Sequence, residues 1–279
     1  MDASVSPSRP ARALVAWLST QEGRRLGGGA ADPDRRRAAR DTRLQRPAVV
    51  DQSGLLGRWP SALEEHALAL QASEGAKSMF AGGWEIGLIT DLRRVIAAQP
   101  TVFVAPEDPV EPVPHDAAEI ARIALPLSAP AAQVPVDFDE ERQTWNITSP
   151  SPNLRITGNF GGEVEPGVLG FGFLVRVLPS FISLAEYRGR YILRDGYHRA
   201  YRFLSHGVLA VPAFIRRFAD DESPFRSGML PEEVYCGERP PTLQDYLDDA
   251  VAEDVWISPR GTTIAVSAGP TSLVFGRLA

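Results

Sequence analysis

One pentapeptide of the sequence, Asp195-Gly196-Tyr197-His198-Arg199, groups the residue types that anion chemistry needs. A glycine lets the backbone turn tightly, and the first N–H groups of a following helix attract anions together with the positive end of the helix dipole. His198 and Arg199 add side-chain donors, and an arginine can hold an oxyanion through two parallel hydrogen bonds. This pentapeptide, the DGYHR turn, is therefore the predicted binding site of a phosphate or carboxylate.

Asp195 and His198 are the residues of the DGYHR turn that could carry catalysis. Beside a bound phosphate, the Asp195 carboxylate would need a metal ion or a proton, or it would act as a general base. Mg²⁺ at Asp195, together with a nucleoside triphosphate, is thus the expected cofactor arrangement. The structural alternative is that Asp195 caps the helix, Gly196 makes the turn, and His198 and Arg199 lie on the surface.

The residues around the turn predict the elements that position it. Strands are expected at 189–194 and 210–218, where β-branched and aromatic residues gather. A helix is expected over 197–206, with apolar residues on one face, polar residues on the other, and Gly207 after its end. The candidate ligand-binding residues of the turn and this helix are Gly196, Tyr197, His198, Arg199 and Arg202.

The segment 191–215, YILRDGYHRAYRFLSHGVLAVPAFI, resembles the ParB/sulfiredoxin superfamily. The signature of that superfamily is a strand, a Gly-x-(His/Arg)-Arg turn, a helix ending in glycine, and a Val-Pro strand; the DGQHR turn of DndB-like proteins is a closer variant. Upstream, segment 149–155 resembles the Pro-Asn-Pro-x-x-Arg box of ParB-like domains. The resemblance implies that Gly196, His198 and Arg199 contact a nucleotide phosphate, with Asn153 and Arg155 as further ligand-binding residues.

Departures from the superfamily narrow the implied function. Tyr197 stands where sulfiredoxin has its catalytic cysteine, which excludes that chemistry. No helix-turn-helix follows residue 218, which argues against a chromosome-partition role. The resemblance therefore implies a nucleotide-binding phosphotransferase or NTPase. The alternatives are a DNA-associated nuclease or a component of DNA modification or defence, and a non-catalytic scaffold of the same fold.

Charge is unevenly distributed along the chain, whose formal net charge is −6. Residues 1–46 hold ten arginines and five acids, a net +5, so the remaining residues carry −11. Residues 188–217 nevertheless hold seven arginines and one acid, a net +6. A cationic patch on an acidic body favours a small anionic ligand over a duplex. The basic N-terminal arm keeps nucleic acid as an alternative partner.

The pattern of apolar residues changes from helical to alternating near residue 134, which predicts an α+β protein. Strand 168–177 is expected in a mixed sheet with the strands around the turn, and the Gly- and Pro-rich segment 158–167 is expected to be a loop. Four regions follow: a disordered basic leader (1–50), a helical N-terminal part (51–130), a ParB/sulfiredoxin-like domain (131–220), and an acidic helix with short strands as a small β-rich extension (221–279).

Composition limits the setting in which the protein works. The apolar runs are too short for a membrane-spanning helix or a secretory signal. The single cysteine, Cys236, excludes an internal disulfide and a cysteine-based zinc site. A cytoplasmic location without a membrane partner is expected. Lys77 is the one lysine among 29 basic residues, an arginine bias that indicates a GC-rich, bacterial genome.

Overall fold

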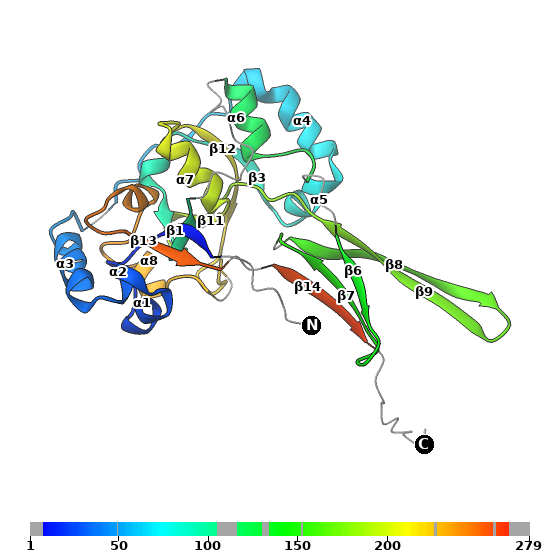
Figure 1. The fold of residues 1–279 in the computed structure, drawn as a ribbon. Helices are drawn as coiled ribbons and strands as arrows, with labels where there is room; N and C mark the ends of the chain where they lie inside the picture. The colour runs from blue at the N-terminus through cyan, green and yellow to red at the C-terminus, as the bar shows by residue number, and fades with distance from the viewer. Residues whose placement is uncertain are drawn as a thin grey trace, which may run out of the picture. The chain divides into compact units, whose positions relative to one another are not determined.

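The computed structural model describes residues 8–48, 50–104, 116–129, 134–151, 153–225, 228–258 and 261–267. The chain forms two compact units, and Figure 1 labels most of their helices and strands. Unit 1 comprises Met1–Ala129 and Pro179–Pro259, and unit 2 comprises Pro130–Leu178 and Arg260–Ala279. Helices and strands together confirm the α+β class. In the described ranges, no helix combines the length and the apolar character that crossing a membrane requires.

Unit 1 is built on a six-stranded mixed sheet with the order β2-β3-β12-β10-β11-β4. Strands β10 and β11 form an antiparallel hairpin, and α7 then crosses over so that β12 runs parallel to β10. The strands are β2 (Leu56–Gly57), β3 (Glu85–Ile89), β4 (Ile96–Ala97), β10 (Ser183–Tyr187), β11 (Arg190–Asp195) and β12 (Val211–Arg217). The accompanying helices are η1 (Ser61–Leu63), α4 (Glu64–Ala72), α5 (Glu74–Ala81), η2 (Leu92–Arg94), α6 (Ala117–Ala124) and α7 (Tyr197–Ser205). The predicted strand–turn–helix–strand is confirmed as β11–α7–β12.

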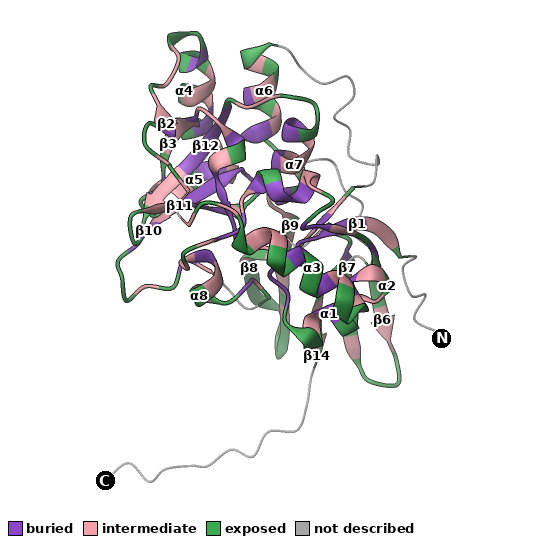
Figure 2. Cartoon of the chain, turned by 90° about the vertical axis from the view of Figure 1, so that its left-hand side faces the viewer, coloured by how far each residue is buried: buried purple, intermediate pink, exposed green. Residues whose placement is uncertain are grey.

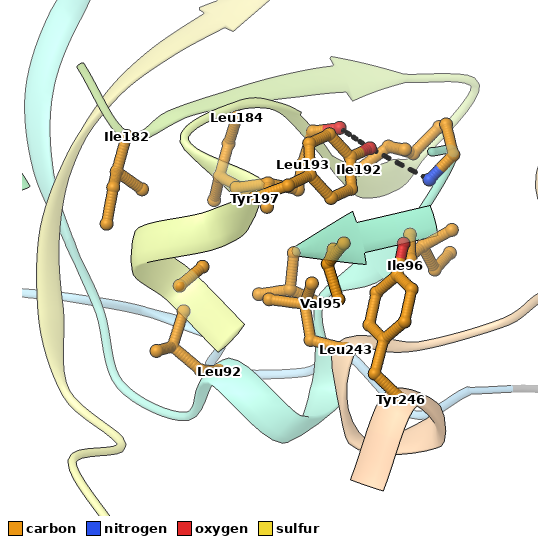
Figure 3. Close-up of a cluster of buried hydrophobic side chains, with 14 of the residues drawn as sticks. Leu92, Val95, Ile96, Ile182, Leu184, Ile192, Leu193, Tyr197, Leu243 and Tyr246 are labelled. Carbon is orange, nitrogen blue, oxygen red and sulfur yellow. Dashed lines mark hydrogen bonds between the residues drawn. The ribbon is translucent and has the colours of Figure 1, made fainter. Parts of the chain in front are cut away.

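The core of unit 1 lies around β10, β11 and α7. Leu184, Ile192, Leu193 and Phe214 are fully buried, and Figure 2 shows the central strands in the buried colour. Runs of consecutive buried residues in β10 and β12 are typical of strands covered on both faces. The close-up in Figure 3 shows side chains of α7, η2 and η3 gathered against these strands. The DGYHR turn thus directly follows buried residues of β11 in this core.

A second, antiparallel sheet of unit 1 contains the first strand of the chain, in the order β13-β1-β5. Its strands are β1 (Arg9–Ala13), β5 (Thr101–Phe103) and β13 (Glu253–Ile257), and the nearby helices are α1 (Thr20–Leu26), α2 (Gly28–Ala31), α3 (Pro33–Leu44), α8 (Glu232–Tyr235) and η3 (Leu243–Leu247). The predicted disordered leader is therefore wrong for residues 8–48. Segment 13–18 is buried, and β1 is the central strand of this sheet.

Unit 2 contains a three-stranded antiparallel sheet, in the order β14-β7-β6, and a separate two-stranded hairpin. The three strands are β6 (Val136–Asp139), β7 (Thr144–Ser149) and β14 (Thr262–Ser267), and the hairpin consists of β8 (Leu154–Glu165) and β9 (Val168–Val177). We call residues 154–177 the hairpin arm. The predicted loop 158–167 is wrong, because most of it continues β8. The predicted strand 168–177 is confirmed, but it belongs to the hairpin arm and not to the sheet that holds β11 and β12.

The predicted region boundaries do not follow the two units. The proposed domain 131–220 is divided at residue 178, since its first part belongs to unit 2 and its second part to unit 1. The region 51–130 contains β2 to β5 as well as helices. The expected acidic helix near 242–252 is the short 3-10 helix η3, which is followed by β13. The predicted regions assumed that segments close along the chain pack together, and this assumption was wrong.

Candidate functional site

Gly196 shapes the DGYHR turn in a way that no other residue could. Its φ of 85° and ψ of 20° are left-handed, and it is the N-cap of α7. A Cβ at this position would lie 2.8 Å from the Cα of Ile182. The glycine is thus required both by the backbone conformation and by the close approach of the neighbouring chain. No side chain caps the N-terminus of α7.

Asp195 is exposed at the end of β11, and its carboxylate stays local. Its Oδ1 accepts a hydrogen bond from the Gly196 N–H at 2.7 Å, instead of reaching the next turn of α7. The described residues include no group of three or more His, Cys, Asp or Glu that could hold a metal ion. One carboxylate could bind Mg²⁺ only with help from the phosphates of a ligand.

Tyr197 is an interior residue. Its hydroxyl accepts a hydrogen bond from the Ala98 N–H at 2.8 Å and donates one to the Leu193 carbonyl; Figure 3 shows the side chain within the buried cluster. Burial raises the pKa of this phenol well above its usual range. The side chain therefore joins α7 to β11 and to the segment after β4, and it has no exposed face to offer the predicted ligand.

Arg199 is committed to backbone carbonyls. Its Nη1 donates to the Ile123 carbonyl at 2.7 Å, and its Nη2 donates to the Ser180 carbonyl at 2.6 Å and to the Ser180 Oγ at 2.5 Å. Ile123 lies in the last turn of α6, where the helix dipole favours a cation. The polar face of α7 at this position thus packs against another part of unit 1. In this geometry the guanidinium connects α7 to α6 and to the segment before β10.

His198 is the exposed member of the turn after Asp195. Its Nδ1 accepts the Phe103 N–H at 3.0 Å, and the two ring centroids lie 5.1 Å apart. The neutral ring must therefore carry its proton on Nε2. His198 connects α7 to β5, while Arg202 lies in the last turn of α7, away from the turn that it was predicted to assist.

Asn153 and Arg155, the remaining predicted ligand contacts, lie in unit 2, whereas the DGYHR turn lies in unit 1. The Asn153 carbonyl accepts the Leu178 N–H at 3.0 Å. The Arg155 Nη1 donates to the Leu154 carbonyl at 2.7 Å. The residues that the resemblance joined into one ligand site are thus divided between two compact units.

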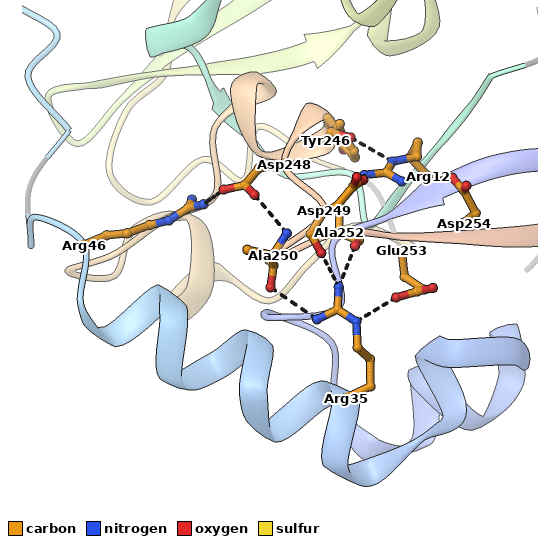
Figure 4. Close-up of polar contacts among 10 residues, drawn as sticks. All are labelled: Arg12, Arg35, Arg46, Tyr246, Asp248, Asp249, Ala250, Ala252, Glu253 and Asp254. Carbon is orange, nitrogen blue, oxygen red and sulfur yellow. Dashed lines mark hydrogen bonds and ion pairs between the residues drawn. The ribbon is translucent and has the colours of Figure 1, made fainter.

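The basic N-terminal arm, by contrast, has partners that sequence reasoning missed. Arg12 contacts Asp254 at 3.0 Å and Asp249 at 2.6 Å, and Arg35 contacts Glu253 at 2.7 Å. Arg46 pairs with Asp245 and, at 2.5 Å, with Asp248, and Figure 4 shows how these contacts converge on one segment. The sequence signals for these ion pairs were the net charge of +5 over residues 1–46 and the run of acids after residue 244. Part of the positive charge predicted for nucleic acid is neutralised within unit 1.

A groove of about 330 Å³ does lie in unit 1, but not at the DGYHR turn. Its wall includes the aromatic rings of Trp59, Phe80 and Trp84. The Arg194 guanidinium lies 5.1 Å above the Trp84 ring. None of the predicted site residues lines this groove.

The hairpin arm carries the apolar surface that sequence reasoning overlooked. Seven of its large apolar side chains are between 48% and 80% exposed: Ile156, Phe160, Val164, Val168, Leu169, Phe171 and Leu174. Single exposed apolar residues are ordinary on protein surfaces, but several exposed together on one hairpin indicate an interaction surface. The available signal was the apolar run after residue 167.

Comparison with known proteins adds no relative to these observations. No protein-family model, no curated protein and no solved structure matches the chain.

Proposed function

We propose that the protein is a non-catalytic scaffold that holds a partner protein through the hairpin arm. The observation that carries this proposal is the group of seven exposed apolar side chains on one hairpin. Burial of apolar surface is the main favourable contribution to most protein–protein association. A two-stranded hairpin is also marginally stable by itself in water, so a partner that covers it would stabilise it.

The geometry of the DGYHR turn supports the same proposal from the other side. Tyr197 and Arg199, two of the residues on which anion chemistry would depend, make hydrogen bonds inside unit 1. Their bonds join α7 to β11, to α6 and to the segment after β4. The turn then has a structural role, because it connects these elements of unit 1. We assign the binding of the partner protein to the exposed hairpin arm.

The experiment that tests this proposal places a photo-crosslinking benzophenone residue on the arm in the cells that make the protein. Phe160 and Phe171, on β8 and β9, are the two labelled positions, and the exposed Leu68 on α4 is the matched control. We expect a discrete covalent adduct from Phe160 or Phe171 and none from Leu68. Adding Leu174→Asp to the Phe160 label, or Leu169→Asp to the Phe171 label, should abolish that adduct. Illumination that gives no adduct at either arm position would reject the proposal.

A second candidate is a ParB/sulfiredoxin-like protein that binds a nucleotide phosphate at the DGYHR turn. It is favoured by the N-terminus of α7, which no side chain caps, and by the exposed His198 beside it. The test is a thermal-shift panel of nucleotides with and without magnesium. A ligand at one hundred times its Kd should add about 2.7 kcal/mol of stability. A shift that His198→Ala abolishes would support the candidate, and unchanged melting with every nucleotide would reject it.

A further inference from the structure

We infer that the partner of the hairpin arm is a second copy of this chain, packed face to face and antiparallel about a twofold axis. The inference rests on the proposed function, since it names the partner of the same arm. The basis is a pattern on one face of the hairpin, where an acid at one end and two arginines at the other flank an apolar middle.

The strand register defines that face. Phe160 pairs with Gly172, Gly158 pairs with Leu174, and Glu165 pairs with Val168. Directly paired residues share a face, and so do alternate residues of β9. A Cβ at Gly172 would lie 2.5 Å from Cζ of Phe160, and a Cβ at Gly170 would lie 3.0 Å from Cγ1 of Val164. We call this the glycine face: Phe160, Val164, Val168 and Leu174 project from it beside Gly158, Gly170 and Gly172.

Charged side chains lie at both ends of the glycine face. Arg176 follows Leu174 by two residues at the base of the hairpin, where it pairs with Arg155, and Glu165 lies opposite Val168 near its tip. Eight residues of β9 separate the two ends, which at about 3.4 Å per residue is roughly 27 Å. Arg176 and Glu165 therefore cannot pair within one hairpin. Among the described contacts, neither side chain has an ion pair.

These positions are self-complementary. Gly172 lies midway between Val168 and Arg176 on β9, with Phe160 opposite it. A twofold axis through this point lays β8 over β8 and β9 over β9, so it places Arg155 and Arg176 of one copy beside Glu165 of the other, twice. It also brings the two Phe160 rings together near the axis and places Leu174 of one copy near Val164 of the other. A dimer interface of this kind uses the same patch on both copies.

The opposite face of the hairpin lacks this complementarity. Leu169, Phe171 and Phe173 project from it, with the Phe171 and Phe173 rings 5.7 Å apart. Glu163, which pairs with Leu169, is its charged residue, and no cation stands at the other end. If two such faces packed antiparallel, Glu163 of each copy would face no opposite charge on the other copy. The glycine face is therefore the one that fits a second copy.

The test is the molecular mass of the full chain in solution, measured by sedimentation equilibrium with two charge-reversal variants. We expect the unmodified chain to sediment at twice its mass of 30.3 kDa. Arg155→Glu combined with Arg176→Glu leaves acids at both ends of the glycine face, and Glu165→Arg leaves arginines at both ends. Each variant alone should dimerise at least about a hundredfold more weakly, because like charges then meet at both contacts. An equal mixture of the two variants should form a heterodimer, since every contact becomes an opposite pair again.

Controls separate this inference from the proposed function. Arg142→Glu reverses an exposed charge of unit 2 outside the hairpin arm and should leave the dimer intact. A monomeric unmodified chain at tens of micromolar, a mixture that stays monomeric, or a dimer that ignores both reversals would each overturn the second copy as partner. If a foreign protein is then crosslinked at Phe160, the scaffold function stands without the dimer. If no arm position crosslinks, both fail.

Discussion

In the DGYHR turn, Gly196 brings the chain so close to Ile182 that a Cβ would lie 2.8 Å from its Cα, whereas in the hairpin arm Gly172 lies under the exposed ring of Phe160. The turn holds residue types that suggest chemistry, yet Tyr197 and Arg199 direct their polar groups to the interior. Part of the arm, residues 158–167, has a composition that suggests a loop, yet the arm is a hairpin that presents apolar side chains to solvent. The role of a side chain therefore depends on which atoms it meets, and residue type alone does not decide it.

The largest expected effect comes from replacing a glycine that both its backbone conformation and its close neighbours require. Gly196→Ala should lower the free energy of unfolding by about 3 kcal/mol or more, because it adds both left-handed strain and a clash. Gly207→Ala is the matched control at the other end of α7, with a φ of 79° and no atom within 4 Å of the added Cβ. It should cost about 1 kcal/mol. Urea denaturation measures both, and equal losses would contradict the tight packing at the turn.

Removing the Arg199 guanidinium tests whether this residue is a joint or a ligand clamp. Arg199→Ala leaves the carbonyls of Ile123 and Ser180 without their donor, so the free energy of unfolding should fall by roughly 2 kcal/mol. Arg142→Ala, which removes an exposed arginine, should change it by less than about 0.5 kcal/mol. Unaltered stability combined with lost nucleotide binding would return Arg199 to the ligand site.

Alkaline pH should weaken the interior of unit 1 through its tyrosines. Burial raises the pKa of Tyr197 and of Tyr246, and it raises the pKa of Tyr235 to about 12. Between the ordinary tyrosine pKa near 10 and pH 12, the unfolded chain loses these protons while the folded chain keeps them. The free energy of unfolding should therefore fall as pH rises through this window, by up to about 1.4 kcal/mol per pH unit for each tyrosine.

Tyr197→Phe removes the contribution of one tyrosine to the fall of the free energy of unfolding with pH. The variant should be less stable near pH 8 by roughly 1–3 kcal/mol, since the Ala98 N–H and the Leu193 carbonyl lose their partner. Its stability should also decline less steeply above pH 10. Chemical denaturation between pH 8 and pH 11 gives both quantities. The single lysine and single cysteine keep competing titrations few, so a flat profile would contradict the burial of these phenols.

The smallest expected effect lies on the arm. Leu169 is 80% exposed, so Leu169→Ser should change the free energy of unfolding by less than about 0.5 kcal/mol. The matched control is Leu184→Ala in β10, which should cost about 3 kcal/mol because that leucine is fully buried. Urea denaturation again supplies the measurement. A large loss for Leu169→Ser would mean that the arm packs against its own chain.

The sequence predicts the β11–α7–β12 unit well because its signals are local. Alternating and continuous apolar runs, a turn glycine and the glycine after α7 all lie within thirty residues. The α+β class follows from the same patterns. The destination of the Arg199 side chain does not, because the carbonyl of Ile123 that it meets lies 76 residues away along the chain.

Long-range partners also explain the two largest errors. The N-terminal segment looks disordered by itself, but Arg12 meets Asp254 across 242 residues of sequence. The glycines of segment 158–167 predict a loop, but this segment pairs with β9, and the Phe160 ring of β8 covers Gly172 of β9. Periodicity within a single segment contains no information about these partners.

The central position of β1 has a consequence for synthesis on the ribosome. Its residues 9–13 pair with residues 253–257, so one side of the strand has no partner until translation has passed nearly the whole chain. At about 5–20 residues per second, that interval is roughly 12 to 50 seconds. During this time the nascent N-terminal segment is an arginine-rich chain without its acidic counterpart. Completion of the three-stranded sheet is therefore a late step that depends on the pace of translation.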